Sequence, residues 1–211
     1  MNDYIEKRDE TAERRYISPQ IEVRMEGDEQ VIEGIAAVVN KETDLGWFTE
    51  RVAPGAFDNV MEGDTVALFN HDPNYPLART NAKDEGKLTL FKTESGDLGY
   101  RFKIPNTSIG RDLAENIRTG VVSKSSFAFT IEEEEWDYKR GQDANDVRTI
   151  KKIKRLYDVS PVTYPAYNDT SVAARSLEKA KMPEKEFHSA KREWDFDLMK
   201  VEQLIDLKSN G

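Results

Sequence analysis

Alternation between apolar and polar residues along the first half of the chain predicts a series of β-strands. Residues 21–25 alternate, a turn signal follows at Gly27, and residues 31–39 form a second apolar run, so we expect a hairpin. Gly34 lies inside the second strand and indicates a bulge or a close approach of another segment. Segment 48–57 is predicted to be a loop that leads into a short helix. Further strands are predicted at 65–69, 87–91, 98–104 and 156–164.

One segment has the period of an α-helix instead. Ile109, Leu113 and Ile117 recur at intervals of four residues, which places them on one helix face. Ser108 is a suitable N-cap, and Gly120 is suitable for the C-terminal cap. We therefore expect one helix directly before the serine-rich segment that follows.

The segment 123–131 begins with small hydroxyl residues and continues as a strand with aromatic side chains. Phe127, Phe129 and Ile131 share one parity and should pack into a core. Ser126 has the opposite parity and lies among small side chains, so we expect it to be approachable. A nucleophilic serine fits this position, although an ordinary strand entry has the same pattern.

Four consecutive glutamates precede a polar turn and a basic segment, which together predict a long charged hairpin. With a turn centred near Asp143, Glu135 lies opposite Lys152. Glu133 then lies opposite Lys154, and opposite charges pair across the hairpin. The interpretation is a solvated edge hairpin, with an acidic recognition patch as the alternative.

Composition divides the chain into three parts. Residues 1–15 are rich in Glu, Lys and Arg and are predicted to be a disordered leader. Residues 16–175 contain the predicted strands and form one domain. Residues 176–211 are a charged tail, in which an apolar stripe over 196–207 predicts a helix.

Charge and residue usage exclude several classes of function. The net charge is −9 and basic residues are interleaved with acidic ones, so the chain shows no basic face for nucleic acid. No apolar run is long enough to span a membrane. Cysteine is absent and histidine occurs only as His71 and His188, which argues against disulfides, thiolate catalysis and a multi-histidine metal site. We therefore expect no metal and no cofactor, and a reducing cytoplasm as the compartment.

His71, Ser126 and Asp158 are the one set of residues with the chemistry of a nucleophilic enzyme. Each lies on or beside a predicted apolar strand, where the backbone can hold its side chain. A serine hydroxyl is a poor nucleophile until a base takes its proton, and a carboxylate can orient that base. The three residue types alone are a weak signal, because most chains contain them.

Five short motifs add specificity to this set. They are Gly34-Ile35-Ala36, Glu50 followed by Pro54-Gly55-Ala56-Phe57, Phe69-Asn70-His71-Asp72, Ser126-Phe127-Ala128-Phe129, and Tyr157-Asp158-Val159-Ser160-Pro161-Val162 closing on Tyr164-Pro165-Ala166. In this order, over residues 21–172, they resemble the prohead (capsid maturation) proteases of tailed bacteriophages of the HK97 type.

The resemblance implies a mostly β (α+β) fold, a herpesvirus-protease-like β-barrel with peripheral helices, followed here by the helical C-terminal tail. It also implies a catalytic role for each matching residue. His71 would be the general base and Ser126 the nucleophile. Asp158 would be the third member, where many relatives have Glu and herpesvirus proteases use a second histidine.

Other residues compete for these roles. Ser123 precedes the serine strand, and Ser125 shares the parity of the buried phenylalanines. Asp72 neighbours His71 but should point to the other face, and Glu50 is a looser candidate for orienting it. His188 belongs to the charged tail and is interpreted as solvated.

The function implied is that of a serine endopeptidase that cleaves capsid and scaffold proteins, and itself, during prohead maturation. The expected partners are the major capsid protein with its scaffold segment, and further copies of this chain, with no nucleic acid and no membrane. The expected location is the interior of the immature capsid in the host cytoplasm. The alternative is a catalytically silent scaffold or capsid-binding module on the same fold.

Overall fold

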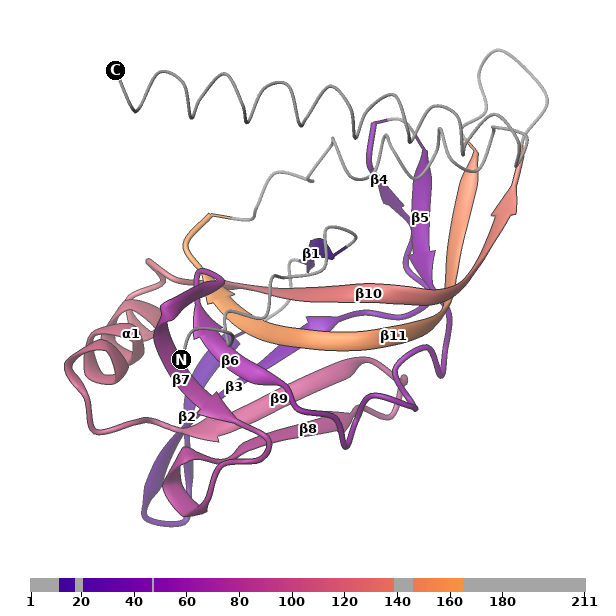
Figure 1. Ribbon diagram of the computed structural model, residues 1–211. Helices are drawn as coiled ribbons and strands as arrows, with labels where there is room; N and C mark the ends of the chain where they lie inside the picture. The colour runs from indigo at the N-terminus through magenta and orange to yellow at the C-terminus, as the bar shows by residue number, and fades with distance from the viewer. Residues whose placement is uncertain (1–11, 18–20, 47, 139–145, 165–211) are drawn as a thin grey trace, which may run out of the picture. The chain divides into compact units, whose positions relative to one another are not determined.

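The computed structural model describes residues 12–17, 21–46, 48–138 and 146–164. Within these ranges the chain is mostly β, with one α-helix and one short 3-10 helix (Figure 1). The predicted tail at 176–211, its helix and His188 lie outside the described residues.

The larger sheet has seven strands and is built around one long hairpin. Strand β10 (Lys124–Asp137) pairs antiparallel with β11 (Val147–Val162) along almost its whole length. The other edge of β10 takes β1 (Glu13–Ile17), and β11 pairs in turn with β5 (Thr49–Val52) and β6 (Val66–Phe69). The sheet is completed by β4 (Thr43–Asp44), beside β5, and β7 (Asp72–Arg79), beside β6.

The smaller sheet has four strands in the order β2, β3, β9, β8. The predicted hairpin is confirmed as β2 (Ile21–Glu26) and β3 (Glu29–Ala37), and two further predicted strands are confirmed as β8 (Leu88–Lys92) and β9 (Leu98–Lys103). A Cβ on Gly34 would lie 2.7 Å from the hydroxyl oxygen of Tyr100. Glycine is therefore required in β3 because the Tyr100 ring crosses its backbone.

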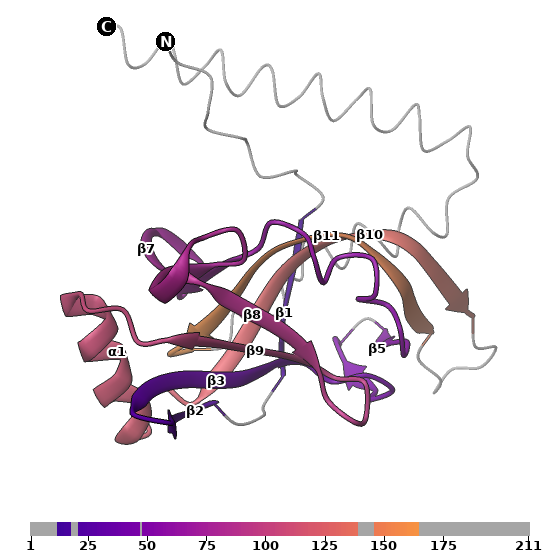
Figure 2. The same ribbon diagram turned by 90° about the horizontal axis from the view of Figure 1, so that it is seen from below.

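The two sheets pack face to face, with the hydrophobic core between them (Figures 1 and 2). Phe127 and Phe129 from β10 stack on each other with ring centroids 4.8 Å apart. They are fully buried together with Ile32 and Tyr100 of the smaller sheet. The parity predicted for the serine strand is thus confirmed, since its aromatic face is the one that enters the core.

Helix α1 (Ser108–Arg118) is confirmed and buries Leu113 and Ile117. Its N-cap is Thr107 rather than Ser108, because the Thr107 side chain accepts a hydrogen bond from the backbone N–H of Gly110. Gly120 follows the helix with φ of +77°, the left-handed conformation that ends many helices. The 3-10 helix η1 (Asp84–Gly86) precedes β8.

Several expectations need correction. Among the described residues, one isolated bridge between Arg79 and Lys87 links the edges of the two sheets, and the strands do not close into a barrel. Opposite ends of β11 pair with two different strands, residues 147–150 with β5 and residues 158–159 with β6. The strands at the edges of the larger sheet are therefore β1, β4 and β7. The segment after Pro54 forms a series of turns instead of a short helix.

The predicted leader also ends earlier than residue 15, because β1 begins at Glu13. Pairing with β10 supplies backbone hydrogen bonds that no pattern inside the leader could indicate. The charged hairpin is confirmed, but Glu133 faces Lys152 and Glu135 faces Thr149. Bulges between residues 130 and 134 shift this register.

Candidate active site

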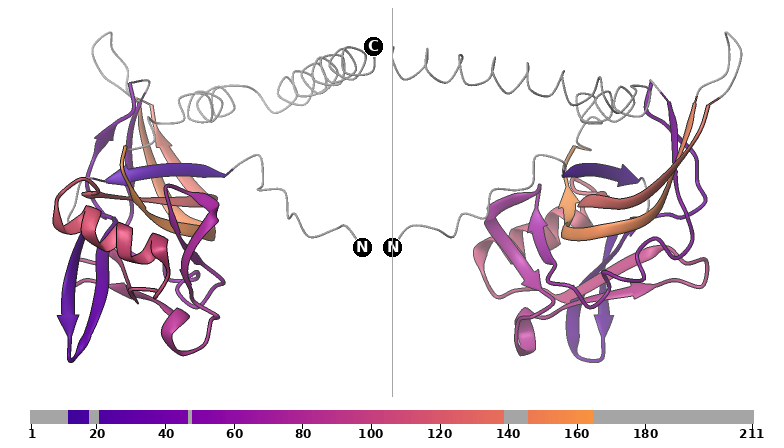
Figure 3. Two further views of the ribbon diagram at one scale, coloured as in Figure 1. Left: turned by 90° about the vertical axis from the view of Figure 1, so that its left-hand side faces the viewer. Right: turned by 45° about the vertical axis from the view of Figure 1, so that its right-hand side comes forward.

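Ser126 lies near the start of β10, on the face opposite the buried phenylalanines. Its side chain is 0% exposed, so the expectation of an approachable serine is wrong. The reason is β1, which runs along the edge of β10 with Tyr16 paired to Ser126 (Figure 3).

His71 is presented by a tight turn between β6 and β7. Phe69 pairs with Asp72, so Asn70 and His71 form a two-residue hairpin loop. Both have positive φ, 54° and 59°, as a type I′ turn requires. The turn is anchored to the end of β11, because the Asn70 N–H donates to the carbonyl of Pro161 at 3.0 Å, and its side-chain oxygen accepts from the N–H of Thr163 at 2.9 Å.

Asp158 lies on β11 directly opposite Ala128 of β10, two residues from Ser126. Residues two apart share a face of the sheet, so Asp158 and Ser126 point the same way. The hydroxyl of Ser160 donates to Oδ1 of Asp158 at 2.8 Å. Asp158 is therefore fixed in orientation by its own strand.

These three elements bring the predicted residues together. Nδ1 of His71 lies 2.5 Å from Oδ1 of Asp158, and Nε2 lies 2.6 Å from Oγ of Ser126. All three side chains are buried. The arrangement suits proton transfer from the hydroxyl to the imidazole, with the carboxylate holding the opposite ring nitrogen.

The Ser126 hydroxyl has a second neighbour in β1. Its Oγ lies 2.9 Å from the carbonyl oxygen of Arg15, to which it donates. A hydroxyl has one proton, so it cannot donate to this carbonyl and to Nε2 of His71 at the same time. Residues near Arg15 were not among the predicted site residues, because a charged leader gives no local signal of such a contact.

The competing residues lie elsewhere. Ser125 is buried in the core and its hydroxyl lies 2.8 Å from that of Tyr100, whose pKa burial raises. Ser123 is exposed and precedes the strand. Asp72 accepts hydrogen bonds from Asn74. Glu50 contacts Arg15 and Arg148 instead of His71.

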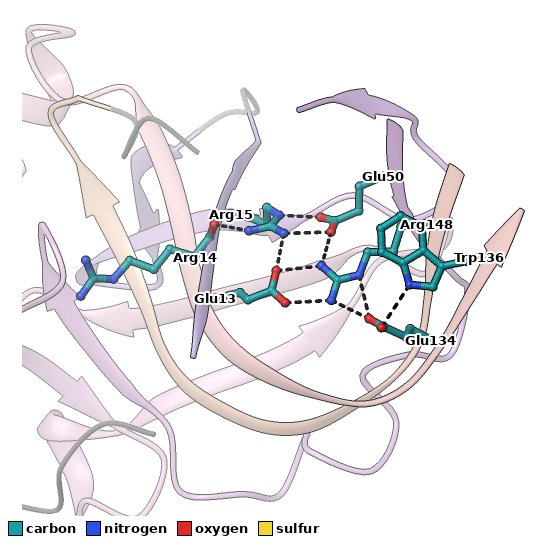
Figure 4. Close-up of polar contacts among 7 residues, drawn as sticks. All are labelled: Glu13, Arg14, Arg15, Glu50, Glu134, Trp136 and Arg148. Atoms are coloured by element: carbon teal, nitrogen blue, oxygen red, sulfur yellow. Dashed lines mark hydrogen bonds and ion pairs between the residues drawn. The ribbon is translucent and has the colours of Figure 1, made fainter. Parts of the chain in front are cut away.

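On the sheet face of Phe127 and Phe129, opposite to the face of Ser126, four buried side chains form a closed ring of alternating charge, which we call the ion ring (Figure 4). Glu13 and Arg15 come from β1, Glu50 from β5 and Arg148 from β11. Arg15 contacts both glutamates, with its Nε 2.5 Å from Glu50, and Arg148 also contacts both, 2.8 Å from Glu13 and 3.1 Å from Glu50. Glu134, at an exposed position, adds a further contact to Arg148.

The ion ring shifts the pKa of Glu13, Arg15 and Arg148. Burial alone would raise the pKa of Glu13, but Arg15 and Arg148 outweigh it and hold that pKa below its ordinary range. Burial would likewise lower the pKa values of Arg15 and Arg148, and the surrounding glutamates raise both. Glu13, Arg15 and Arg148 are therefore charged at neutral pH.

Among the described residues, no group of three or more histidine and acidic side chains could hold a metal ion. The helices in the same part of the chain include none that is long and apolar enough to cross a membrane.

The fold and the site define a mostly β protein with a buried Ser–His–Asp constellation. A family model described as caudovirus prohead serine protease matches residues 19–184. The chain belongs to this family and is thus a capsid maturation protease of a tailed phage, a class that acts in the procapsid inside the host cell. A search of curated proteins finds no match.

Among solved structures, the bacteriophage T4 capsid assembly protease is similar to this chain. The sequences are 14% identical, and the match covers 73% of this chain and 98% of the other, with a TM-score of 0.45.

Proposed function

We propose that the chain is a serine endopeptidase in which Ser126 is the nucleophile, His71 the general base and Asp158 the residue that orients it. The observation that carries the proposal is the pair of short contacts that His71 makes, 2.6 Å to Ser126 and 2.5 Å to Asp158. No other described serine has such a contact with a histidine.

In the proposed reaction, Oγ of Ser126 attacks the carbonyl carbon of the scissile peptide while its proton passes to Nε2 of His71. Asp158 accepts the Nδ1–H of the imidazolium and stabilises its charge. His71 then gives its proton to the leaving amine nitrogen, and the C–N bond breaks. Water, deprotonated by His71, releases the acyl group and restores the Ser126 hydroxyl.

The proposed substrates are the major capsid protein, its scaffold segment and the chain itself, inside the immature capsid. Membership of the prohead protease family supports capsid and scaffold proteins as the substrate class. The ion ring and the pairing of strand β1 with β10 favour substrates that bind as extended peptide segments.

The test is co-expression of the chain with its capsid protein, followed by detection of the processed band. Ser126→Ala should abolish processing, with a loss on the order of a thousandfold or more. Ser123→Ala is the matched control, because Ser123 is exposed and nearby, and it should process normally. Equal processing by the Ser126→Ala variant would remove Ser126 from the proposed role.

The alternative, a catalytically silent capsid-binding module, is favoured by one observation. Ser126 is fully buried and donates to Arg15, so a chain held in this arrangement cannot receive a substrate. The two functions differ in whether Ser126 reacts with a serine-directed phosphonate, since a silent module would stay unmodified in every state.

A further inference from the structure

Strand β1 covers the edge of β10 at the candidate nucleophile. Residues 13–17 pair antiparallel with residues 125–129, and the other edge of β10 is filled by β11. In this part of the sheet, the edge beside Ser126 is therefore available only to β1 or to a strand that replaces it. Peptides commonly bind to proteins by adding a strand to such an edge.

β1 also presents its backbone to Ser126 as a bound peptide would. It is an extended segment whose Arg15 carbonyl oxygen lies 2.9 Å from Oγ of Ser126. By accepting the hydroxyl proton, this carbonyl withdraws it from Nε2 of His71. The strand thus occupies the position of a substrate and prevents the first proton transfer.

The charge balance of the ion ring allows such a replacement. β1 contributes one negative and one positive side chain, Glu13 and Arg15. When it leaves, Glu50 and Arg148 remain as a pair, 3.1 Å apart. No buried charge is then left without a partner. Removing one member of a buried ion pair is costly because it leaves such an unpaired charge, and that cost does not arise here.

We propose that β1 is a built-in occupant of the substrate-binding edge, and that Glu50 and Arg148 are the residues that select the substrate. The substrate class is an extended segment with an acidic and a basic residue two positions apart, in the order Glu-x-Arg. Arg148 contacts the acidic side chain and Glu50 the basic one. This inference rests on the proposed function, because it assumes that Ser126 is the reactive residue.

The first experiment measures how fast Ser126 in the full-length chain is modified by a serine-directed phosphonate, followed by intact-mass spectrometry. The variant Glu13→Arg with Arg15→Glu keeps the net charge but makes two of the four ring contacts repulsive. Its modification should be at least about tenfold faster than that of the unchanged chain, since a shift of about 1.4 kcal/mol in strand release is a factor of ten.

The matched control is Glu115→Arg with Arg118→Glu, which exchanges the charges of an exposed ion pair on helix α1 and also keeps the net charge. Neither residue belongs to β1 or to the candidate triad. Modification of this variant should proceed at the rate of the unchanged chain. A second variant, Glu13→Gln with Arg15→Gln, removes the charges without repulsion and should react at an intermediate rate.

The second experiment tests the substrate class with free peptides. A peptide with the sequence of residues 12–17, Ala-Glu-Arg-Arg-Tyr-Ile, is added to the charge-exchanged variant and should slow modification of Ser126. A peptide in which the glutamate and the second arginine change places should protect at least about tenfold less. The unchanged chain should respond to neither peptide at the same concentration, because its own strand competes at an effective concentration in the millimolar range.

Four outcomes of these experiments would contradict the proposals. Equal modification rates in the unchanged and charge-exchanged chains would overturn the blocking role of β1, and equal protection by the two peptides would overturn the Glu-x-Arg substrate class. Loss of the folded state in both variants, seen by circular dichroism, would also overturn the proposal, because a strand that a substrate replaces cannot be needed for folding. Ser126 that stays unmodified in every folded variant would instead sink the proposed serine chemistry itself.

Discussion

Ser160 holds the carboxylate of Asp158 by a hydrogen bond within strand β11. Its hydroxyl donates to the Asp158 oxygen that also contacts His71. Two partners on this one oxygen resist its rotation away from the imidazole. The residue therefore positions Asp158 without touching the reacting atoms.

We predict that Ser160→Ala lowers the rate of capsid-protein cleavage about tenfold, while the free energy of unfolding changes by only about 1 kcal/mol. Cleavage time courses and urea titrations of the same preparation measure the two effects. Ser160→Thr keeps the donor and should restore most of the rate. An unchanged rate in Ser160→Ala would show that Asp158 is held by other contacts.

The depressed pKa of Glu13 has a consequence for stability in acid. A carboxyl group whose pKa is lower in the folded than in the unfolded state stabilises the fold fully above its unfolded pKa. This stabilisation is lost as the pH falls through the folded pKa. Glu13 should therefore contribute most at neutral pH and little in strong acid.

Glu13→Gln should accordingly lower the free energy of unfolding by about 2–3 kcal/mol near neutral pH, and the difference from the unchanged chain should shrink in acid. Urea unfolding at about pH 7 and about pH 3 measures the two differences. Glu26→Gln, at an exposed position, serves as the control and should show a small difference throughout. A constant difference for Glu13→Gln would contradict the lowered pKa.

At the scale of single elements, the turn at Asn70 and His71 is the most constrained part of the site. Two consecutive residues without a glycine adopt positive φ there, which costs about 1–2 kcal/mol for most side chains and less for asparagine. The hydrogen bonds from the end of β11 offset this cost. The turn therefore depends on its anchor, and the position of His71 depends on the turn.

We predict that Asn70→Ala destabilises the fold by about 1–2 kcal/mol and slows cleavage by more than that loss explains, because His71 is no longer held against Ser126. Asn70→Asp retains the oxygen that accepts from Thr163 and tolerates positive φ, so it should keep most of the activity. Thermal melts and cleavage assays at a temperature where all forms are folded separate stability from activity. Equal activity of the two variants would show that the anchor does not position His71.

The strands that carry the site are far apart in the sequence and meet only through the larger sheet. β6 and β7 supply His71, β10 supplies Ser126 and β11 supplies Asp158. Because β11 pairs with β10 and β6 on its two edges, it brings the base and the nucleophile to opposite sides of its own carboxylate. The hairpin of β10 and β11 is thus the frame of the whole site.

At the scale of the whole molecule, we predict self-cleavage within residues 176–192, a charged stretch interrupted by Pro183 that lies outside the described residues. Charged sequences with few apolar residues are the kind that proteases commonly bind in extended form. Purified active chain should therefore lose mass from its C-terminus, while Ser126→Ala stays at full length. Intact-mass spectrometry after incubation measures both, and equal trimming of the two would assign the cut to a host protease.

The sequence by itself determined most of the strands, the one α-helix and the residues of the candidate site. The parity of Phe127 and Phe129 separates the core face of β10 from the face with Ser126, and this follows from a period of two that any strand must obey. Asn70-His71 ends an apolar run, and Asp158 lies on another. The triad was therefore predictable as a set, and the structure brings its members into contact.

Only the tertiary structure decided which other residues contact the candidate triad and the strands that carry it. Arg15 contacts Ser126 across 111 residues of sequence, and Glu13 meets Arg148 across 135. Strand edges are generic, since any extended segment can pair with them, so a charged leader carries no local mark of the edge that it will fill. For the same reason the pattern of strands predicted a β fold but could not show that its two sheets remain open.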